Sequence, residues 1–468
     1  MMKFKNREKE LDFLKNLKPP VRLAVVGRRR IGKTTLVNHF FKEALFLFMS
    51  AEKTEKEMIM EWIDENRNRL YLPQVGTLGE FFDYLFRKEK DIVIFIDEFQ
   101  NVLKVNRSFL FDLQKLLDRN RDVNIVVTGS YISIMKKIIE DYKSPLYGRF
   151  DFTIKLREFD FRTVADICID SGYSAEDAVR FYSVFGGVPK YYEALERLGF
   201  PGFKKAVESM FVLYPRPLGE EIRTMLREEF GKEHKMFFSI LSSISAGKNT
   251  LKEISEYTDK IQTGLTKYIS LLKDDFELIT REIPVTEKKS KRGGYRITSN
   301  VFQFWLYFIW RNYSMLEGNE DEALMQKVSN EIESYVGKIF EDIAKEALKS
   351  GDVGLPFKPE RIGRQWGKLP QKQPGSNQYE IDLVGLNEKT GEIFFCECKW
   401  GSLGTPEAER IIRDLKEKAK SVQWNGNRRH EYFGIIAREI KDKNILRKNG
   451  FIALDISDLY DSSRHSRP

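Results

Sequence analysis

The sequence has only three cysteines, four histidines and no long apolar segment. Cys168 stands alone, and Cys396-x-Cys398 has no second cysteine or histidine cluster near it, which argues against a disulfide framework and against a zinc site. The longest strongly apolar stretch, 301–310, is far shorter than the roughly 20 residues of a membrane-spanning helix. The first residues are charged and lack the apolar core of a secretory signal. We therefore expect a cytoplasmic protein without a membrane partner, in which 301–310 forms a buried helix.

Neither composition nor charge indicates a disordered chain. The 468 residues are 41% hydrophobic and 32% charged, which is typical of folded domains with ionic surfaces. This length suits two to four domains. The 78 basic residues exceed the 70 acidic ones and give a net charge of +8, which permits an anionic partner without naming one.

A phosphate-binding loop is the strongest pattern in the chain. Residues 23–26 predict a strand, followed by the spacing Gly-x-x-x-x-Gly-Lys-Thr and then by a helix with apolar spacing. In such a loop the glycines let backbone N–H groups surround a phosphate, Lys33 reaches its β and γ oxygens, and the Thr34 hydroxyl can bind Mg²⁺. The residues predicted to hold a nucleotide here are Gly27, Arg28, Arg29, Arg30, Ile31, Gly32, Lys33, Thr34 and Thr35. The alternative is a plain glycine turn between a strand and a helix.

A second buried strand ends in two acids. Residues 92–96 are apolar throughout, as in the central strand of a parallel sheet. Asp97 follows and is predicted to hold the Mg²⁺ shell, while Glu98 is predicted to polarise an attacking water. The two carboxylates therefore receive different roles.

A third apolar segment, 124–130, also predicts a strand of this sheet. It ends in Thr128 and Ser130, small polar groups suited to sensing the γ-phosphate. The alternative is an ordinary strand that ends in a polar turn.

Several motifs in order resemble the archaeal-type P-loop ATPases that lie close to the AAA+ and STAND groups. Besides the two phosphate-site segments they are FKNREKELDFL at 4–14, VVTGSY at 126–131, SPLYGR at 144–149 and FGGVPKYY at 185–192. The resemblance covers roughly 1–300. It implies that Asn6, Arg7 and Glu8 lie near the adenine, that Pro189 packs on the base, and that Arg149 is an arginine finger or a conformational sensor. A salt bridge at a domain edge is the alternative role for Arg149.

A winged helix-turn-helix is predicted between 216 and 300. Apolar residues recur with helical spacing over 251–257 and 265–272, and two β-rich segments flank a polar turn at 286–294. The basic residues assigned to this wing, opposed only by Glu287, are Lys288, Lys289, Lys291, Arg292 and Arg296. They fit a wing that contacts phosphates of DNA. The alternative is a solvated loop on a winged helix used for internal packing.

The segment EIDLVGLNEKTGEIFFCECKW at 380–400 combines acids and a lysine on a predicted hairpin. Glu397 and Lys399 are two positions apart on one strand and so share a face, while the two cysteines between and before them point to the other side. The turn folds the preceding strand back, so that Asp382, and in one alternative Glu380, approach Glu397. Two carboxylates can bind a hard cation, and a neighbouring lysine can stabilise charge on a phosphate. The alternative is a surface hairpin with its polar groups in water.

The arrangement Asp382…Glu397-x-Lys399 resembles the PD-(D/E)xK nuclease superfamily, with Ile381 where the pattern has proline. The resemblance spans about 331–468, and it implies that Glu341 on the upstream helix is an additional metal ligand. Trp366, Lys368 and the helix at 410–422 add aromatic and basic surface, which could equally be a solvated face. Such folds can keep their shape and lose catalysis.

The predicted protein is an α/β P-loop ATPase with a helical lid, a winged helix-turn-helix and a C-terminal α/β restriction-endonuclease-like domain. The predicted bounds are 1–155 for the ATPase, 156–215 for the lid, 216–300 for the winged helix, 301–330 for a connecting helical segment and 331–468 for the nuclease-like domain. The expected cofactors are ATP or ADP and Mg²⁺, DNA is the expected partner, and a homo-oligomer is left open. The alternative is a STAND-like nucleotide switch whose C-terminal domain is a catalytically silent scaffold.

Overall fold

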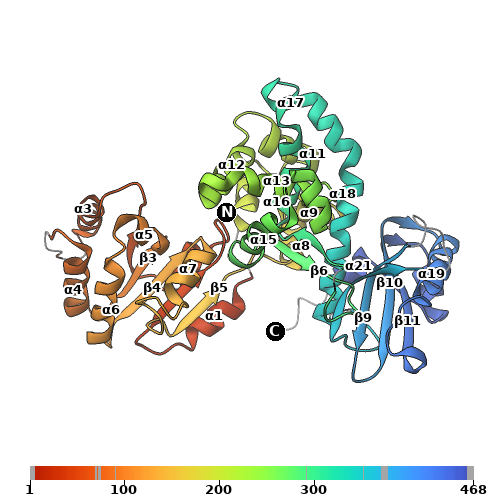
Figure 1. Cartoon of the computed structure of the whole chain (residues 1–468), viewed down its shortest axis with the longest axis horizontal. Helices are drawn as coiled ribbons and strands as arrows, with labels where there is room; N and C mark the ends of the chain where they lie inside the picture. The colour runs from red at the N-terminus through yellow and green to blue at the C-terminus, as the bar shows by residue number, and fades with distance from the viewer. Residues whose placement is uncertain are drawn as a thin grey trace. The chain divides into compact units, whose positions relative to one another are not determined.

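The computed structural model describes residues 6–68, 71, 75–89, 91–290, 292–351, 353–369 and 378–460. Phe4 of the N-terminal motif and Lys291 of the predicted wing lie outside these residues. The chain divides into two compact units (Figure 1). The first contains residues 1–159, 188–197 and 274–276, and the second contains 160–187, 198–273 and 277–468.

The first unit is built on a five-stranded parallel sheet in the order β2-β3-β4-β1-β5. Its strands are β1 (Arg22–Val26), β2 (Leu45–Phe48), β3 (Val93–Asp97), β4 (Asn124–Gly129) and β5 (Phe152–Lys155). Its helices are α1 (Glu8–Lys15), α2 (Lys33–Phe40), α3 (Glu55–Asn66), α4 (Leu78–Lys88), α5 (Val102–Val105), α6 (Phe109–Arg119), α7 (Ile132–Ile139) and α10 (Pro189–Arg197).

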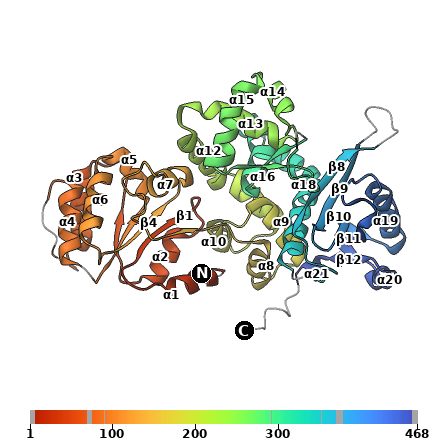
Figure 2. The same ribbon diagram turned by 60° about the horizontal axis from the view of Figure 1, so that its bottom comes forward.

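Helices cover both faces of this sheet, so its central strands are apolar throughout. On one face Ala24 and Ile96 pack in a core with the helices α3, α4, α6 and α7 (Figure 2). On the other face Val25 and Phe95 pack with α1 and α2. Because side chains alternate along a strand, neighbouring residues supply opposite cores. Because β1, β3 and β4 are parallel, their carboxyl ends lie at the same edge of the sheet, where the predicted phosphate loop and acids are found.

The second unit begins with helices and a small hairpin. The helices before the C-terminal sheet are α8 (Phe161–Asp170), α9 (Ala175–Phe185), α11 (Phe203–Val207), α12 (Pro217–Phe230), α13 (His234–Ser245), α14 (Leu251–Thr258), α15 (Gln262–Ser270), α16 (Asn300–Phe304), α17 (Tyr313–Glu317) and α18 (Asp321–Ser350). The side chain of Thr250 caps α14, and its N3 residue Glu253 completes a capping box. Strands β6 (Ile279–Glu282) and β7 (Gly294–Ile297) form an antiparallel pair. The predicted buried helix at 301–310 is confirmed as α16 continued by a π-helical turn, Trp305–Ile309.

The second unit ends in a mixed five-stranded sheet in the order β12-β11-β10-β9-β8. Its elements are β8 (Arg361–Lys368), β9 (Gln378–Asn387), β10 (Glu392–Leu403), α19 (Thr405–Ala419), β11 (His430–Ile440), α20 (Lys443–Lys448), β12 (Ile452–Asp455) and α21 (Ile456–Leu459). The predicted hairpin is confirmed, since β9 and β10 pair antiparallel with Glu392 opposite Asn387. Strands β10, β11 and β12 are parallel. The helices α18 and α19 lie on opposite faces of this sheet (Figure 2).

The predicted α/β class is confirmed, with a parallel sheet in the first unit and a mixed sheet at the C-terminal end. In the described part of the chain, no helix combines the length and the apolar character that crossing a bilayer requires.

Candidate functional site

The phosphate loop is shaped by two glycines at its ends. The Gly27 N–H donates to the Gly129 carbonyl at 3.2 Å, which ties the loop to β4. A Cβ at Gly27 would lie 2.4 Å from Ile31 Cδ1 and 2.6 Å from the Leu156 carbonyl oxygen, so a side chain does not fit there. Gly32, at φ +90°, precedes α2 in the left-handed region that favours glycine. The loop therefore ends directly at a helix N-terminus, as a phosphate site requires.

Lys33 turns back from the start of α2 toward the end of β4. Its Nζ donates to Ser130 Oγ at 2.8 Å and to the Arg28 carbonyl at 3.0 Å, and the residue is only 5% exposed. Burial lowers the pKa of Lys33, while the carboxylates of Glu98 and Asp97 oppose this effect. Because a buried charge is costly unless it is paired, an anion would be a favourable further partner for this poorly solvated ammonium.

Asp97 and Glu98, for which different roles are predicted, form hydrogen bonds with different partners. Asp97 Oδ2 accepts from Thr34 Oγ1 at 2.7 Å, and Oδ1 accepts from the Thr128 hydroxyl. Glu98 Oε1 accepts from Ser130 Oγ at 2.5 Å. Glu98 also has φ +54°, a left-handed conformation that is rare for a residue with a side chain. Asp97 is thus bonded to Thr34, whose hydroxyl is predicted to bind Mg²⁺. Glu98 is bonded to Ser130, which is predicted to sense the γ-phosphate.

Gln100 completes the second half of this network. Its Nε2 donates to Glu98 Oε2, and its Oε1 is buried without a hydrogen-bond partner among the described residues. The sequence reasoning missed Gln100, although its place two residues after Glu98 was a usable signal. The hydroxyl of Thr34 and the carboxylate of Asp97 are hard oxygen ligands, so the residues present fit a Mg²⁺ ion.

The residues predicted to lie near the adenine come from two segments of the first unit, 6–8 and the start of α10. The Arg7 guanidinium donates to the carbonyls of Ile31 and Arg157, both at 2.9 Å, and lies 4.9 Å from the Phe159 ring centroid. Arg7 therefore anchors the N-terminal segment to the phosphate loop. The other three comprise Asn6 beside Arg7, Glu8 exposed at the start of α1, and Pro189 buried at the start of α10.

The arginines of the loop have partners of their own. Arg28 forms an ion pair with Glu158 at 3.7 Å, and Arg29 donates to the Tyr131 hydroxyl at 2.9 Å. Arg30 lies in the loop with φ +67°, and Ile31 is buried in the core around α2. Thr35 follows Thr34 in the first turn of α2.

Arg149 forms a salt bridge, which was the alternative role for this residue. Its guanidinium donates to both carboxylate oxygens of Asp118, at 3.2 and 3.1 Å. Both partners are partly exposed, at 28% and 52%. The pair joins the loop before β5 to the end of α6.

In the second unit, the predicted acids and lysine of the C-terminal hairpin come together. Asp382 Oδ2 accepts from the Cys398 N–H at 2.8 Å and from Lys399 Nζ at 3.4 Å. Lys399 Nζ also donates to Glu397 Oε2 at 2.9 Å, and Glu397 is only 4% exposed. Burial and the nearby Asp382 raise the pKa of Glu397, with Lys399 opposing. Burial tends to lower the pKa of Lys399, but Asp382 and Glu397 outweigh it and raise this pKa.

A second lysine, which the sequence reasoning did not single out, reaches the same carboxylate. Lys418 of α19 donates to Glu397 Oε1 at 2.7 Å, so each oxygen of Glu397 accepts from a different ammonium. Leu415 and Ala419 of α19 are buried against the sheet. Lys418 lies three residues after Leu415, so the helical period places it at the edge of the buried face of α19. This spacing could have identified Lys418 from the sequence.

Glu341 is held by an arginine instead of by the hairpin. Its carboxylate forms an ion pair with Arg364 of β8. Burial raises the pKa of Glu341 to about 7, Arg364 opposes the shift and Asp382 adds to it. Glu380 is 61% exposed and lies 4.0 Å from Arg364. Within the described residues, no group of three or more Asp, Glu, His or Cys side chains is arranged to hold a metal ion.

A metal ion at the hairpin would therefore meet competition. Carboxylate oxygens are suitable ligands for a hard cation, but Lys399 and Lys418 already occupy both oxygens of Glu397. A cation could use Asp382 and Glu397 only after at least one ammonium had moved. Asp382 and Glu397 therefore fit a metal ion only if Lys399 or Lys418 leaves the Glu397 carboxylate.

The turn predicted to be a DNA-contacting wing packs on the C-terminal sheet. The Val285 N–H donates to the Arg364 carbonyl at 3.0 Å, and the Val285 side chain lies in the core of that sheet. Thr286 donates twice to Gln365 Oε1, at 3.2 and 3.0 Å. Trp366 Nε1 donates to the Arg292 carbonyl at 3.1 Å. This packing agrees with the alternative of internal packing.

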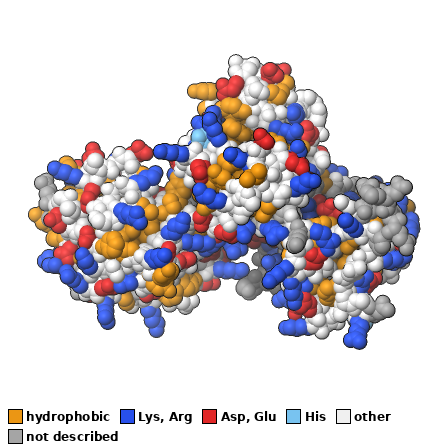
Figure 3. Space-filling view, in the orientation of Figure 1, with side chains coloured by type: hydrophobic (Ala, Val, Ile, Leu, Met, Phe, Trp, Pro, Cys, Tyr) orange, Lys and Arg blue, Asp and Glu red, His pale blue; other side chains and the backbone are white. Residues whose placement is uncertain are grey.

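The charges of this turn are largely paired as well. Lys288 pairs with Glu388 at 3.1 Å, and Arg292 pairs with Glu287. Arg296 lies on β7 and pairs with Asp342 of α18, so it is not at the tip of a wing. Lysine and arginine side chains are spread among acidic ones over the face seen in Figure 3.

Two family models match separate parts of the chain. A family model described as an AAA domain matches residues 21–165, and one described as archaea bacterial proteins of unknown function matches residues 305–411. An uncharacterized protein of Methanocaldococcus jannaschii is 29% identical over 429 residues, which are 90% of this chain and 92% of that protein.

Two solved structures are also similar. A Walker-type ATPase of Pyrococcus abyssi shares 20% identity with a TM-score of 0.51, over 65% of this chain and 96% of that chain. The ORC2 protein of Aeropyrum pernix, in ADPNP–ADP complexes, shares 14% identity with a TM-score of 0.44, over 68% and 95% of the two chains. The predicted resemblance to archaeal P-loop ATPases is confirmed: residues 21–165 match the AAA domain model, and residues 305–411 match a family of unknown function.

Proposed function

We propose that this protein binds ATP or ADP and hydrolyses ATP at the edge of the parallel sheet. The observation that carries the proposal is the single hydrogen-bonded network that joins Lys33, Ser130 and Glu98. It lies beside the Thr34–Asp97 pair, at the carboxyl ends of three strands. A phosphate-binding lysine, a metal-binding hydroxyl–carboxylate pair and a separate acid are the parts that phosphoryl transfer to water needs.

Each side chain has a defined task in this scheme. Lys33 gives up its bonds within the protein and donates to the β and γ oxygens. Glu98, held in place by Ser130 and Gln100, accepts a hydrogen bond from the attacking water and orients it. Thr34 and Asp97 would hold Mg²⁺, which supplies neutralising charge when bound. Arg149 is proposed to keep its salt bridge with Asp118, and Asn6, Arg7, Glu8 and Pro189 are proposed to flank the base.

The test is binding and turnover by the purified full chain. Nucleotide binding is measured by titration calorimetry with ATP and ADP, and phosphate release is measured with and without Mg²⁺. We expect saturable binding and Mg²⁺-dependent release. A protein that binds neither nucleotide with Mg²⁺ present would sink the proposal.

A second candidate function is metal-dependent cleavage of DNA by the C-terminal sheet. It is supported by the convergence of Asp382, Glu397 and Lys399 on one edge, in the pattern of a nuclease-like domain. Lys399 and Lys418 would then neutralise a phosphate that replaces the carboxylate as their partner. Single- and double-stranded DNA are incubated with Mg²⁺ or Mn²⁺, with and without ATP. Cleavage by the parent, lost in Asp382→Ala with ATP hydrolysis retained, is the expected result.

The alternative is a STAND-like switch with a silent scaffold. It is supported by the two ammonium groups that already occupy Glu397 and by the ion pair of Glu341 with Arg364. If no DNA form is cut with any divalent metal, while nucleotides still bind, the switch is the better account.

The winged helix, the domain bounds and the cytoplasmic location are also proposals. The order of α13, α14, α15, β6 and β7 supports a winged helix, and the packing of its turn on β8 supports a role in internal assembly. DNA would then contact other surfaces. We retain the predicted domain bounds and a cytoplasmic location as proposals. Whether the protein forms a homo-oligomer stays open.

A further inference from the structure

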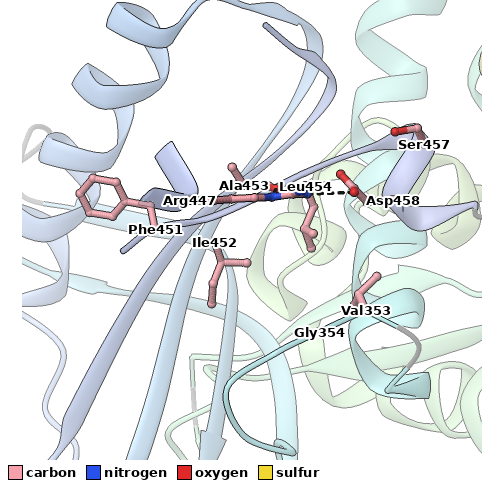
Figure 4. A pocket seen from close by; sticks show the side chains of 9 residues that line it. All are labelled: Val353, Gly354, Arg447, Phe451, Ile452, Ala453, Leu454, Ser457 and Asp458. Carbon is pink, nitrogen blue, oxygen red and sulfur yellow. Dashed lines mark hydrogen bonds and ion pairs between the residues drawn. The ribbon is translucent and has the colours of Figure 1, made fainter. Parts of the chain in front are cut away.

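Two cavities formed by described residues of the second unit lie away from the sites above, and they differ in whether their charged side chains are already paired. The first, of about 320 Å³, lies beside β12 (Figure 4). Its Arg447 donates to Asp458 at 2.8 Å and to the Ala453 carbonyl at 3.0 Å. These charged groups satisfy each other, so the cavity offers a ligand no free charge.

The second cavity, of about 430 Å³, lies between α12, α13, α14 and the turn after α16. Its lining consists of Arg227, His234, Lys235, Phe238, Ser239, Ser242, Tyr257 and Trp310. Four of these residues, at 235, 238, 239 and 242, have the spacing of one helix face. The opposite face of α13 is buried, with Phe237, Leu241 and Ile244 almost fully covered. Helix α13 thus presents a lysine and two hydroxyls to the cavity.

The polar groups of this cavity favour an anion. Arg227 and Lys235 are exposed, and neither forms an ion pair with any other residue that the structure describes. No aspartate or glutamate is among the residues that line the cavity. Ser242 Oγ is shielded from solvent and has no hydrogen-bond partner in the described part of the chain. A shielded hydroxyl without a partner costs free energy, so a ligand or water that bonds to it is favoured.

The other walls are aromatic. Trp310 packs 4.9 Å from the Phe238 ring and forms an apolar wall, and Tyr257 is 43% exposed. His234 uses Nδ1 for the Gly231 carbonyl at 2.9 Å. The volume lies within the range of about 300–1,000 Å³ that small-molecule sites occupy. In sites for single-stranded nucleic acid, bases stack on aromatic side chains while basic side chains bind the phosphates, and this cavity contains both kinds of group.

We propose that this cavity binds the phosphate and the planar base of a nucleotide, either free or as one unit of a single strand. Arg227 and Lys235 bind the phosphate, Ser242 donates to it, and the base rests against Tyr257 and Trp310. The site is separate from the phosphate loop, which lies in the other unit. It therefore goes beyond the proposed ATPase, and it stands if that proposal fails.

The test measures binding of dTMP and of a fluorescent ten-nucleotide oligo(dT) by the full chain carrying Lys33→Ala, which removes the lysine of the phosphate loop. The double variant Arg227→Ala/Lys235→Ala should weaken binding at least tenfold. The matched control is Lys232→Ala/Lys260→Ala, which removes the same charge from exposed lysines outside the cavity and should leave binding within about twofold.

Ser242→Ala provides a second variant that does not depend on net charge. It should weaken binding several-fold without lowering the melting temperature, because the hydroxyl it removes has no partner in the described chain. Equal affinity for dTMP and the oligonucleotide identifies a free nucleotide as the ligand, and much tighter binding of the oligonucleotide identifies a strand. Absence of saturable binding of both probes, or equal loss in the control variant, would overturn the proposal.

Discussion

Replacing Ser130 by alanine should separate nucleotide binding from hydrolysis. Ser130 is 6% exposed, and its hydroxyl is the one among the described residues that contacts both Lys33, at 2.8 Å, and Glu98, at 2.5 Å. In Ser130→Ala the lysine keeps its charge and its path to the phosphates, so affinity for ATP should change by less than about threefold. Glu98 loses the hydrogen bond that fixes one of its two oxygens, so the attacking water is less well oriented.

The size of this effect follows from the bond that is lost. A hydrogen bond to a charged group contributes about 1.5–3 kcal/mol. If all of it is expressed in the transition state, kcat falls by about 10- to 150-fold. Steady-state phosphate release and calorimetric ATP titration measure the two quantities separately.

A matched control and a clear contrary result are available. Ser133→Ala removes a buried serine of α7 that contacts neither Lys33 nor Glu98 in the structure, and it should keep the parental kcat. Parental kcat in a folded Ser130→Ala protein would refute the positioning role of Ser130. A loss of the same size in both serine variants would refute it as well.

Three further predictions concern stability and the remaining charged groups. Val285→Ala should cost about 1–2 kcal/mol and lower the melting temperature, because Val285 is 8% exposed in the core of the C-terminal sheet; an unchanged melting temperature would contradict its burial there. Arg149→Ala should cost at most about 1 kcal/mol, since its pair with Asp118 is partly exposed, and a loss of ATP hydrolysis beyond about twofold would favour the arginine-finger role. The pKa of Glu341, raised to about 7 from the usual 4.5 by burial, means that the folded state keeps a proton that the unfolded state releases. Titration of this carboxyl should therefore cost the parent up to about 3 kcal/mol as the pH rises from 4.5 to 7. Glu341→Gln should lose about that much less over the same range, because other buried carboxyls such as Glu346, with a pKa raised to about 7, still titrate in it. Melting temperatures of the two proteins that fall in parallel from pH 5 to 8 would contradict this.

Sequence patterns sufficed where the chemistry is local. The phosphate loop needs a strand, two glycines and a helix in sequence, and each leaves its own signal within a dozen residues. The hairpin of Asp382, Glu397 and Lys399 was also accessible, because the period of two assigns each side chain to a face and a short turn fixes the pairing.

Contacts between distant segments left no such signal. Thr286 and Gln365 are 79 residues apart, and nothing in either segment indicates that the turn of the predicted wing packs on β8. The same holds for the ion pair of Arg364 with Glu341, which takes that acid away from its predicted metal role. The cavity on α13 depends on helices brought together by the fold, so its residue types alone could not predict it.

The most direct test of the central claim is ATP hydrolysis by three proteins measured side by side. The parent should release phosphate only with Mg²⁺ present, and chelation of the metal should stop it. Lys33→Ala should lose tight ATP binding, because the phosphates lose a fixed countercharge. Glu98→Gln should bind ATP and hydrolyse it slowly, because an amide cannot polarise the water. Turnover at the parental rate in both variants would contradict the assignment of this site.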